Sequence, residues 1–183
     1  MEQQLKPLHL ACGDDDMRPN LCLIQIKNQI ATATNGYMIA RINLAQTTAL
    51  DVATLAILEG KTIHAEVWRE IWKCDQLTFS EKQIDCWKNG IHKTLYYSEP
   101  NGEFFNTNSI VLDCADGGEE EKRIISYNPK FIAILAKIFQ TEILTFSFSK
   151  GNKGTFVFPN DTDGMFAVLM PCDSTNLNRY YFN

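Results

Sequence analysis

A repeated order of elements constrains this chain more than any other feature of its sequence. Residues 61–99 and residues 122–171 each predict the order β-α-β-β-β, and the tetrapeptide Leu-Thr-Phe-Ser opens the strand after the helix in both copies, at 77–80 and 144–147. Neither unit can bury its sheet face alone. We therefore expect an α+β fold in which the two units pair, with both helices side by side against a continuous antiparallel sheet.

Apolar periodicity and capping residues set the expected elements of each unit. The first unit predicts a helix over 65–73 and strands over 62–64, 77–80, 83–87 and 92–97. The second predicts a helix over 129–139, capped by Asn128 with Pro129 at its first position, and strands over 123–126, 144–148, 154–158 and 165–170.

The chain before the repeat predicts a three-stranded meander over 21–26, 30–34 and 37–43. Asn35-Gly36 favours a two-residue type I′ turn, which would pair Thr34 with Tyr37 and Thr32 with Ile39. Taken alone, this is an ordinary hairpin with no function beyond folding. Residues 8–12 predict a further short strand. Residues 47–59 favour a helix with a capping box at Thr48 and Asp51, although 54–58 also suits a strand.

The pattern divides the chain into two parts. Residues 1–60 would form a partial domain, and residues 61–183 a domain made of the two repeats. The polar, turn-rich linker 100–121 joins the repeats, and its one apolar run, 109–112, predicts one more strand.

Composition excludes several classes of protein. The 183 residues are 45% hydrophobic and 21% charged, which is an ordinary globular profile. No apolar run is long enough to span a membrane, the N-terminus does not resemble a signal peptide, and six scattered cysteines suit a reducing compartment, so we expect a cytoplasmic protein with no membrane partner. The net charge of −5 argues against nucleic acid wrapped over the whole surface, but leaves room for a local basic stripe.

Residues with catalytic or metal-binding chemistry do not form a recognisable site. His9, His64 and His92 lack metal-ligand spacing with cysteine or acid. The acidic runs 14–16 and 160–164 suit a solvated loop and a β-turn better than a metal loop. We expect no enzyme activity, no metal and no cofactor.

Five short strings, in order, resemble the bacterial sliding clamp family, the DNA polymerase III beta subunit. Residues 33–40 are similar to the family's Ala-Thr-Asp-Gly-His-Arg-Leu-Ala, although Tyr37-Met38 replaces His-Arg. The other strings are Arg18 with Leu21, Phe104 to Asn108, Tyr127 to Lys130, and Phe166 to Pro171. The resemblance spans residues 17–172 and implies a shortened clamp: the DNA-clamp-like fold of duplicated β-α-β-β-β units with an added N-terminal meander.

The resemblance also implies two surfaces. An apolar pocket would bind peptides of polymerase or other clamp-binding proteins, and its lining would be Leu21, Thr34, Gly36, Tyr37, Met38, Ile39, Val168 and Met170. The two helices would present cations to duplex DNA, namely Arg69, Lys73, Lys130 and Lys137. Ordinary alternatives are a seam between two sheets and a solvated helix face.

Two functional hypotheses follow. The first is a non-enzymatic sliding-clamp-like protein that acts in DNA replication by binding DNA, replication-protein peptides or both, and that assembles with further copies of itself. The second is a clamp-derived interaction module that binds partner proteins without encircling DNA. An unrelated function on a similar fold is a third reading.

Overall fold

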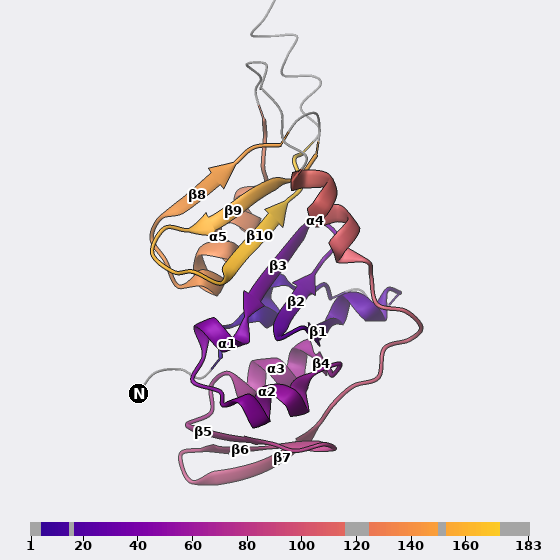
Figure 1. Ribbon diagram of the computed structural model, residues 1–183, viewed down its shortest axis with the longest axis vertical. Coiled ribbons are helices and arrows are strands. Elements are labelled where there is room, and N and C mark those ends of the chain that lie inside the picture. Colours follow the sequence, from indigo (N-terminus) through magenta and orange to yellow (C-terminus); the bar gives the residue numbers. More distant parts are fainter. Residues whose placement is uncertain (1–4, 15–16, 116–124, 150–152, 173–183) are drawn as a thin grey trace, which may run out of the picture.

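Two antiparallel sheets organise the chain in the computed structural model, which describes residues 5–14, 17–115, 125–149 and 153–172. The larger sheet has the strand order β4-β1-β2-β3-β10-β9-β8, and the smaller has the order β5-β6-β7 (Figure 1). The strands of the larger sheet are β1 Leu23–Lys27, β2 Ile30–Thr34, β3 Met38–Asn43, β4 Thr62–His64, β8 Leu144–Ser147, β9 Thr155–Pro159 and β10 Met165–Leu169. Those of the smaller are β5 Gln76–Phe79, β6 Gln83–Lys88 and β7 Ile91–Tyr96.

Helices cover both faces of the larger sheet. The described helices are η1 Leu8–Ala11 and η2 Pro19–Cys22, both 3-10, and α1 Leu44–Thr47, α2 Val52–Leu58, α3 Ala65–Ile71, α4 Thr107–Ala115 and α5 Pro129–Phe139. In Figure 1, α5 lies behind β9 and β10, α4 crosses the opposite face, and α2 and α3 lie between the two sheets. The α+β class predicted from the sequence is confirmed.

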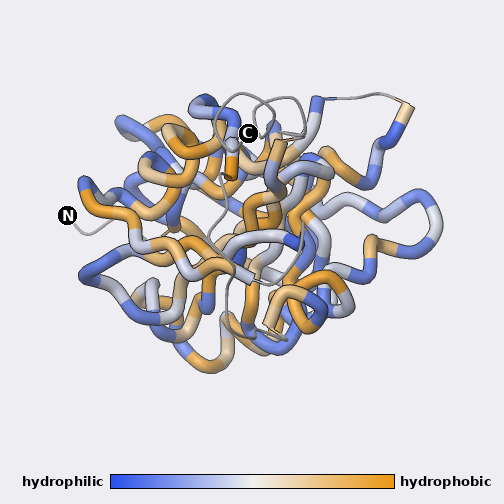
Figure 2. The backbone as a smooth tube through the Cα atoms, turned by 90° about the horizontal axis from the view of Figure 1, so that it is seen from above, coloured by the Kyte–Doolittle hydropathy of each residue, from blue (hydrophilic) through white to orange (hydrophobic). Residues whose placement is uncertain are grey.

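The face that carries α3 and α5 holds the main core. The short helix η1 packs against both α3 and α5. The largest side chains buried there include Trp68 of α3, Phe139 of α5 and Leu8 of η1. In Figure 2, hydrophobic stretches run through the middle of the molecule, and several of the loops that reach outward are hydrophilic. Burial of these apolar surfaces is the main force that joins the elements.

The hairpin between β2 and β3 differs from the predicted one in its strand pairing and in its turn. Thr34 pairs with Ile39 and Thr32 with Arg41, so the predicted partners Tyr37 and Ile39 are wrong. Three residues, 35 to 37, lie between β2 and β3, and Gly36 alone among them has a positive φ, of +87°. Asn35 closes the loop with its side chain, whose Oδ1 accepts hydrogen bonds from the backbone N–H groups of Tyr37 and Met38. The hydrogen bonds of the Asn35 side chain thus close this turn without the two positive-φ residues that a type I′ turn needs.

Type I′ geometry occurs at two other turns. Asn28 and Gln29, between β1 and β2, have φ of 52° and 62°. Asn89 and Gly90, between β6 and β7, have φ of 51° and 75°. Both are two-residue connections with positive φ at both positions, which matches the right-handed twist of the strands that they join.

The expected sheet shared by both repeats does not form. The last three strands of the first repeat, β5 to β7, make their own sheet, whereas its first strand, β4, pairs with β1. The meander β1–β3 instead joins the second repeat through the pairing of β3 with β10. Periodicity identifies these strands but cannot specify which edges meet, because each edge offers the same backbone groups.

Several local predictions were wrong. Residues 8–11 form η1 rather than a strand, and residues 21–22 end η2 before β1 begins. Residues 47–59 contain the helix that the sequence favoured, α2, but this helix begins only at Val52, and Asp51 rather than Thr48 caps it, because the Asp51 side chain accepts the N–H of Thr54. Residues 123–124 of the predicted strand 123–126 lie outside the described residues, and Ser126 makes one isolated bridge, to Cys172. The division at residue 60 stays a prediction.

The predicted strand at 109–112 is the most consequential error, because this run lies inside helix α4. Asn106 starts the helix: its Oδ1 accepts the N–H of Ser109 at 3.3 Å, as an N-cap residue does at the third helical position.

Within the described segments, no helix reaches the length and apolarity that crossing a bilayer requires.

Candidate functional site

A cavity of about 420 Å³ lies on the outer face of the larger sheet, where the ends of β3 and β10 meet α4. Its lining comes from η2, β3, α4, β10 and the segments beside them. The lining residues are Arg18, Leu21, Thr34, Gly36, Met38, Ile39, Phe105, Thr107, Ile110, Asp113, Cys114, Lys153, Gly154, Val168 and Met170. This volume lies within the range typical of ligand pockets. We call this cavity the α4 pocket.

The floor of the α4 pocket is apolar and closely packed. Ile39 of β3 pairs directly with Val168 of β10, and Cys114 of α4 packs against both. All three side chains are at most 5% exposed. Burial raises the pKa of the Cys114 thiol, so this sulfur is a packing group rather than a nucleophile.

The rim of the pocket is apolar but exposed. Phe105 is 42% exposed, Ile110 40% and Met170 36%. Clustered exposed apolar side chains around a concave floor are typical of surfaces that bind a partner. Charges at the edge include Arg18 and Lys153, whose Nζ donates to the carbonyl oxygen of Asp113 at 2.8 Å.

Side-chain hydrogen bonds hold α4 over the sheet. Buried Ser149 donates its hydroxyl to the carbonyl oxygens of Cys114, at 2.5 Å, and Gly154, at 2.8 Å. At the other end, the Nδ2 of Asn20 donates to the carbonyl oxygens of Asn101 and Glu103, and its Oδ1 accepts the N–H of Asn101. These polar anchors fix the segment that brings Phe105 and Ile110 to the pocket.

Two glycines keep the pocket open. A Cβ at Gly154 would overlap Cγ1 of Val168 and stand 3.1 Å from the Cys114 sulfur and 3.2 Å from the Met170 sulfur. Gly36 needs its positive φ to turn the chain at the hairpin tip. Both glycines therefore determine the shape of the lining.

The structure brings together seven of the eight residues that the sequence placed in a peptide pocket. Leu21, Thr34, Gly36, Met38, Ile39, Val168 and Met170 all line the cavity. Tyr37 does not. Its ring stacks on Phe131 of α5, with centroids 5.8 Å apart, and only its backbone serves the pocket, because its carbonyl oxygen accepts the N–H of Met170.

Sequence reasoning missed the side of the pocket that α4 provides. Phe105, Thr107, Ile110, Asp113 and Cys114 were absent from the predicted lining. The signal was present: Asn106 precedes a helix-compatible run in which Ile110 and Cys114 are four residues apart and thus share one face. The β-branched residues of the run favoured a strand instead.

The four predicted DNA-facing cations are exposed, but their surroundings differ. Arg69 of α3 forms an ion pair with Glu66, and Lys73 lies 5.8 Å from the ring centre of Trp72. With Glu66 and Glu70, the α3 segment carries as many acids as bases. Lys130 and Lys137 lie on α5, whose sequence contains no acid. Among the described residues, no group of three or more His, Cys, Asp or Glu side chains has a metal-binding arrangement.

Comparison with known proteins gives matches by structure. No protein-family model matches the sequence, and no curated protein matches it either. Among solved structures, the chain is similar to the DNA polymerase sliding clamp from Pseudomonas aeruginosa, with a TM-score of 0.61 and 15% identity over 93% of this chain and 64% of that one.

Two further sliding clamps of known structure are similar to this chain to the same degree. The beta sliding clamp of Caulobacter crescentus gives a TM-score of 0.64 at 12% identity, over 92% of this chain and 64% of that one. The clamp of Bacillus subtilis gives 0.62 at 10% identity, over 92% and 60%. This chain thus spans less than two thirds of the length of the clamps that it matches. Nearly the whole described chain has the fold of the bacterial DNA polymerase sliding clamps, as the sequence strings predicted.

Proposed function

We propose that this chain is a non-enzymatic, sliding-clamp-related protein of DNA replication, and that it binds a short peptide segment of a partner protein in the α4 pocket. The clamp fold supports the general role. The α4 pocket supports the binding mode, since its apolar floor and exposed apolar rim suit one or two large apolar side chains of an extended peptide.

One observation carries the proposal. Seven residues that a sequence resemblance assigned to a peptide pocket, from three separate stretches of chain, line one cavity. Met38 and Met170 add adaptable thioether side chains to this lining, which suits a pocket that accepts different anchors. Each buried Leu or Phe anchor is worth roughly 1.5–3 kcal/mol, so two anchors together supply about 3–6 kcal/mol, which supports binding between about millimolar and tens of micromolar.

The test uses peptides selected from a random phage-displayed library on the full chain. The decisive variant is Ile110→Asp, which puts a charge on the rim of the α4 pocket. The matched control is Leu112→Asp, because Leu112 is on the same helix, is 69% exposed and does not line the pocket. We expect the affinity for selected peptides to fall at least about tenfold in I110D and to be unchanged in L112D. Equal affinity in both variants would contradict the proposal.

DNA binding is a second candidate function, favoured by the helix α5. Lys130 and Lys137 are exposed on a helix without acids, a local basic surface in an acidic chain. If these cations contact phosphates, duplex affinity should fall with salt, and the slope should flatten in K130Q/K137Q but not in the control K82Q/K88Q. Binding without such a change, or no binding, would favour an interaction module that does not encircle DNA. Light scattering of the same samples gives the oligomeric state.

A further inference from the structure

A second feature of the outer face is the buried cation Arg41 on β3. Arg41 is only 9% exposed. Its Nη2 donates to Thr107 Oγ1 at 2.7 Å and to Asn108 Oδ1 at 2.6 Å, both neutral acceptors. Its Nε is buried without a hydrogen-bond partner, and no carboxylate pairs with it in the part of the chain that the structure describes. A buried guanidinium is ordinarily paired with an anion, because its desolvation is costly.

The position of Arg41 also favours an anion beside it. Thr107 and Asn108 are the first two residues of the nine-residue helix α4, so the guanidinium lies at the positive end of that helix. A cation there is electrostatically unfavourable, whereas an anion is favoured. The Arg41 guanidinium and the positive N-terminus of α4 therefore meet at one point of the sheet face. Helix N-termini commonly bind oxyanions.

Two hollows meet at Arg41. One, of about 470 Å³, has a largely polar lining that includes Lys27, Thr32, Thr107 and Asn108 beside Arg41. Lys27 adds a second cation, and Glu103 is the one acid in this lining. The other, of about 430 Å³, lies toward β10 and includes Phe158, Asp163 and Phe166.

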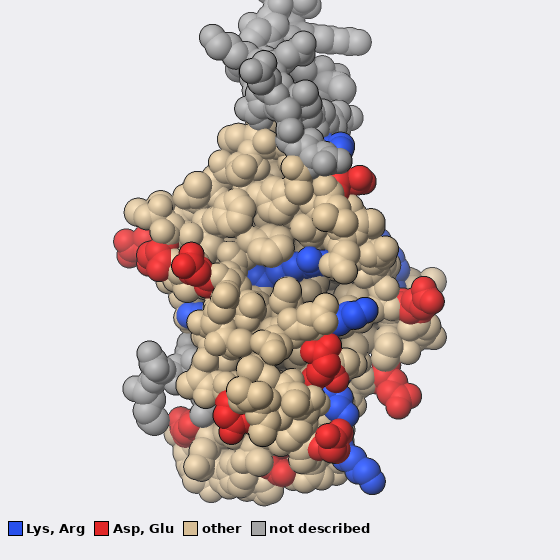
Figure 3. Space-filling model, viewed as in Figure 1, with Lys and Arg blue, Asp and Glu red and all other residues tan. Residues whose placement is uncertain are grey.

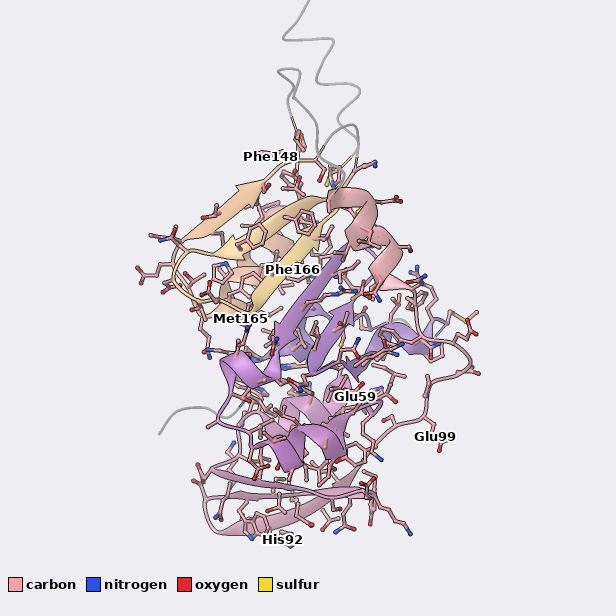
Figure 4. All side chains as sticks on the ribbon, in the orientation of Figure 1. Glu59, His92, Glu99, Phe148, Met165 and Phe166 are labelled. Atoms are coloured by element: carbon pink, nitrogen blue, oxygen red, sulfur yellow. The ribbon has the colours of Figure 1, made fainter. Side chains whose placement is uncertain are left out.

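Figures 3 and 4 place this point on the molecule. Figure 3 shows basic side chains near the middle of this face, below a surface over β9 and β10 that is nearly free of charge. Figure 4 labels Phe166 on β10, and the Cζ of Arg41 lies 5.9 Å from the centre of that ring. The ring therefore supports the guanidinium from one side, and the polar hollow lies on the side of Thr107.

The polar hollow adjoins the α4 pocket. Phe105 and Thr107 line both cavities. A peptide whose apolar anchors fill the α4 pocket would therefore extend a neighbouring residue past Phe105 toward Arg41 and Lys27. The residue type that satisfies an unpaired guanidinium in a mostly polar hollow is an acidic one.

We propose that Arg41, the N-terminus of α4 and Lys27 form an oxyanion site, and that its natural occupant is the carboxylate of an Asp or Glu next to the apolar anchor of the bound peptide. The oxyanion site itself is independent of the proposed function, whereas the peptide as source of the carboxylate rests on it.

The first test measures the oxyanion site without any peptide. The Nε–Hε NMR signal of Arg41 is followed while inorganic phosphate is added, with sodium chloride at equal ionic strength as the reference. We expect a saturable shift with phosphate at about the millimolar level, weakened in K27Q and unchanged in K82Q. Absence of a phosphate-specific shift overturns the oxyanion site.

Asn108→Asp is the sharper variant, since it keeps the shape of the side chain. The new carboxylate would form an ion pair with the Arg41 guanidinium, in the place where Asn108 Oδ1 now accepts its hydrogen bond. We expect N108D to lose the phosphate response and to fold at least as stably as the parent, because an Asp is also favourable in the first turn of α4. Unchanged phosphate binding in N108D overturns the assignment to Arg41.

The second test identifies the source of the anion. Library-selected peptides should carry Asp or Glu beside the apolar anchor, and replacing it by Asn or Gln should lower affinity roughly tenfold in the parent but not in N108D. If Arg41 responds to phosphate but the selected peptides carry no acid, the oxyanion site stands and the claim that a peptide carboxylate occupies it is wrong. If no peptide binds at all, the proposed function fails, and the phosphate test still decides the oxyanion site.

Discussion

Gly154 and Val168 lie on adjacent chain segments at the floor of the α4 pocket, so close that a Cβ on Gly154 would overlap Cγ1 of Val168. The pocket therefore depends on the absence of one side chain. Gly154→Ala should destabilise the fold by about 1–3 kcal/mol through overpacking. The double variant G154A/V168A should recover most of this loss, since Val168→Ala removes the obstructing methyl group. Chemical denaturation of the three variants measures the coupling, and strictly additive losses would contradict this packing.

The Tyr37–Phe131 stack joins the hairpin tip to α5, and the structure separates its role from that of the pocket. Because Tyr37 is 60% exposed, the stack should contribute about 0.5–1 kcal/mol in a double-mutant cycle with Phe131. Tyr37→Ala should leave the affinity for selected peptides unchanged, as the side chain does not line the α4 pocket. A large loss of affinity in Y37A, measured by calorimetry, would show that the tip contacts the peptide after all.

The turn between β1 and β2 has an unfavourable residue at its second position. Gln29 has a φ of 62°, in the left-handed region that glycine tolerates best. Gln29→Gly should stabilise the chain by about 0.5–1 kcal/mol, since the turn becomes the Asn-Gly type already present at Asn89-Gly90. Thermal and urea unfolding measure the change, and Asn89→Ala provides the opposite control. A destabilised Q29G would mean that the Gln29 side chain has an additional role.

His9 should make stability depend on pH. Burial, reinforced by the nearby Lys73 and Arg69, lowers the pKa of His9 from 6.5 to about 4. Between these two values the unfolded chain binds a proton that the folded chain does not, so stability should fall as the pH falls from 6.5 toward 4. We expect a loss of roughly 1–2 kcal/mol after allowing for the partly exposed ring.

The variant His9→Phe isolates this effect. It keeps an aromatic ring against Trp72, on which His9 stacks at 5.8 Å, but it cannot titrate. The difference in unfolding free energy between parent and H9F should change over this pH interval, whereas the carboxylates contribute equally to both. An identical pH profile for the two proteins would contradict the shifted pKa.

Local chemistry made part of this fold predictable. Asn128 and Pro129 mark the start of α5, and the predicted strands 154–158 and 165–170 closely match β9 and β10. The pairing of β3 with β10 was not predictable from periodicity, because it joins residues more than a hundred positions apart. Helix α4 was missed because its β-branched run outweighed the capping signal of Asn106.

The candidate site was predictable to a similar degree. Seven lining residues came from the resemblance to clamps, which carries information about which strands meet. Ile110 and Cys114 were missed together with helix α4, and the place of Gly154 against Val168 depends on packing that periodicity does not show. Arg41 gave no signal, because an arginine in an alternating strand normally faces solvent.

The central claim, that the α4 pocket binds a peptide, is tested most directly by the methyl signals of methionine. Met38 and Met170 line the pocket, whereas Met165, near the other end of β10, lies in the separate hollow beside Phe166. In protein with ¹³C-labelled methionine methyl groups, a library-selected peptide should shift the Met38 and Met170 signals together, along one saturation curve, and leave the Met165 signal in place. Saturable binding that shifts Met165 but neither Met38 nor Met170 would place the peptide elsewhere and contradict the account.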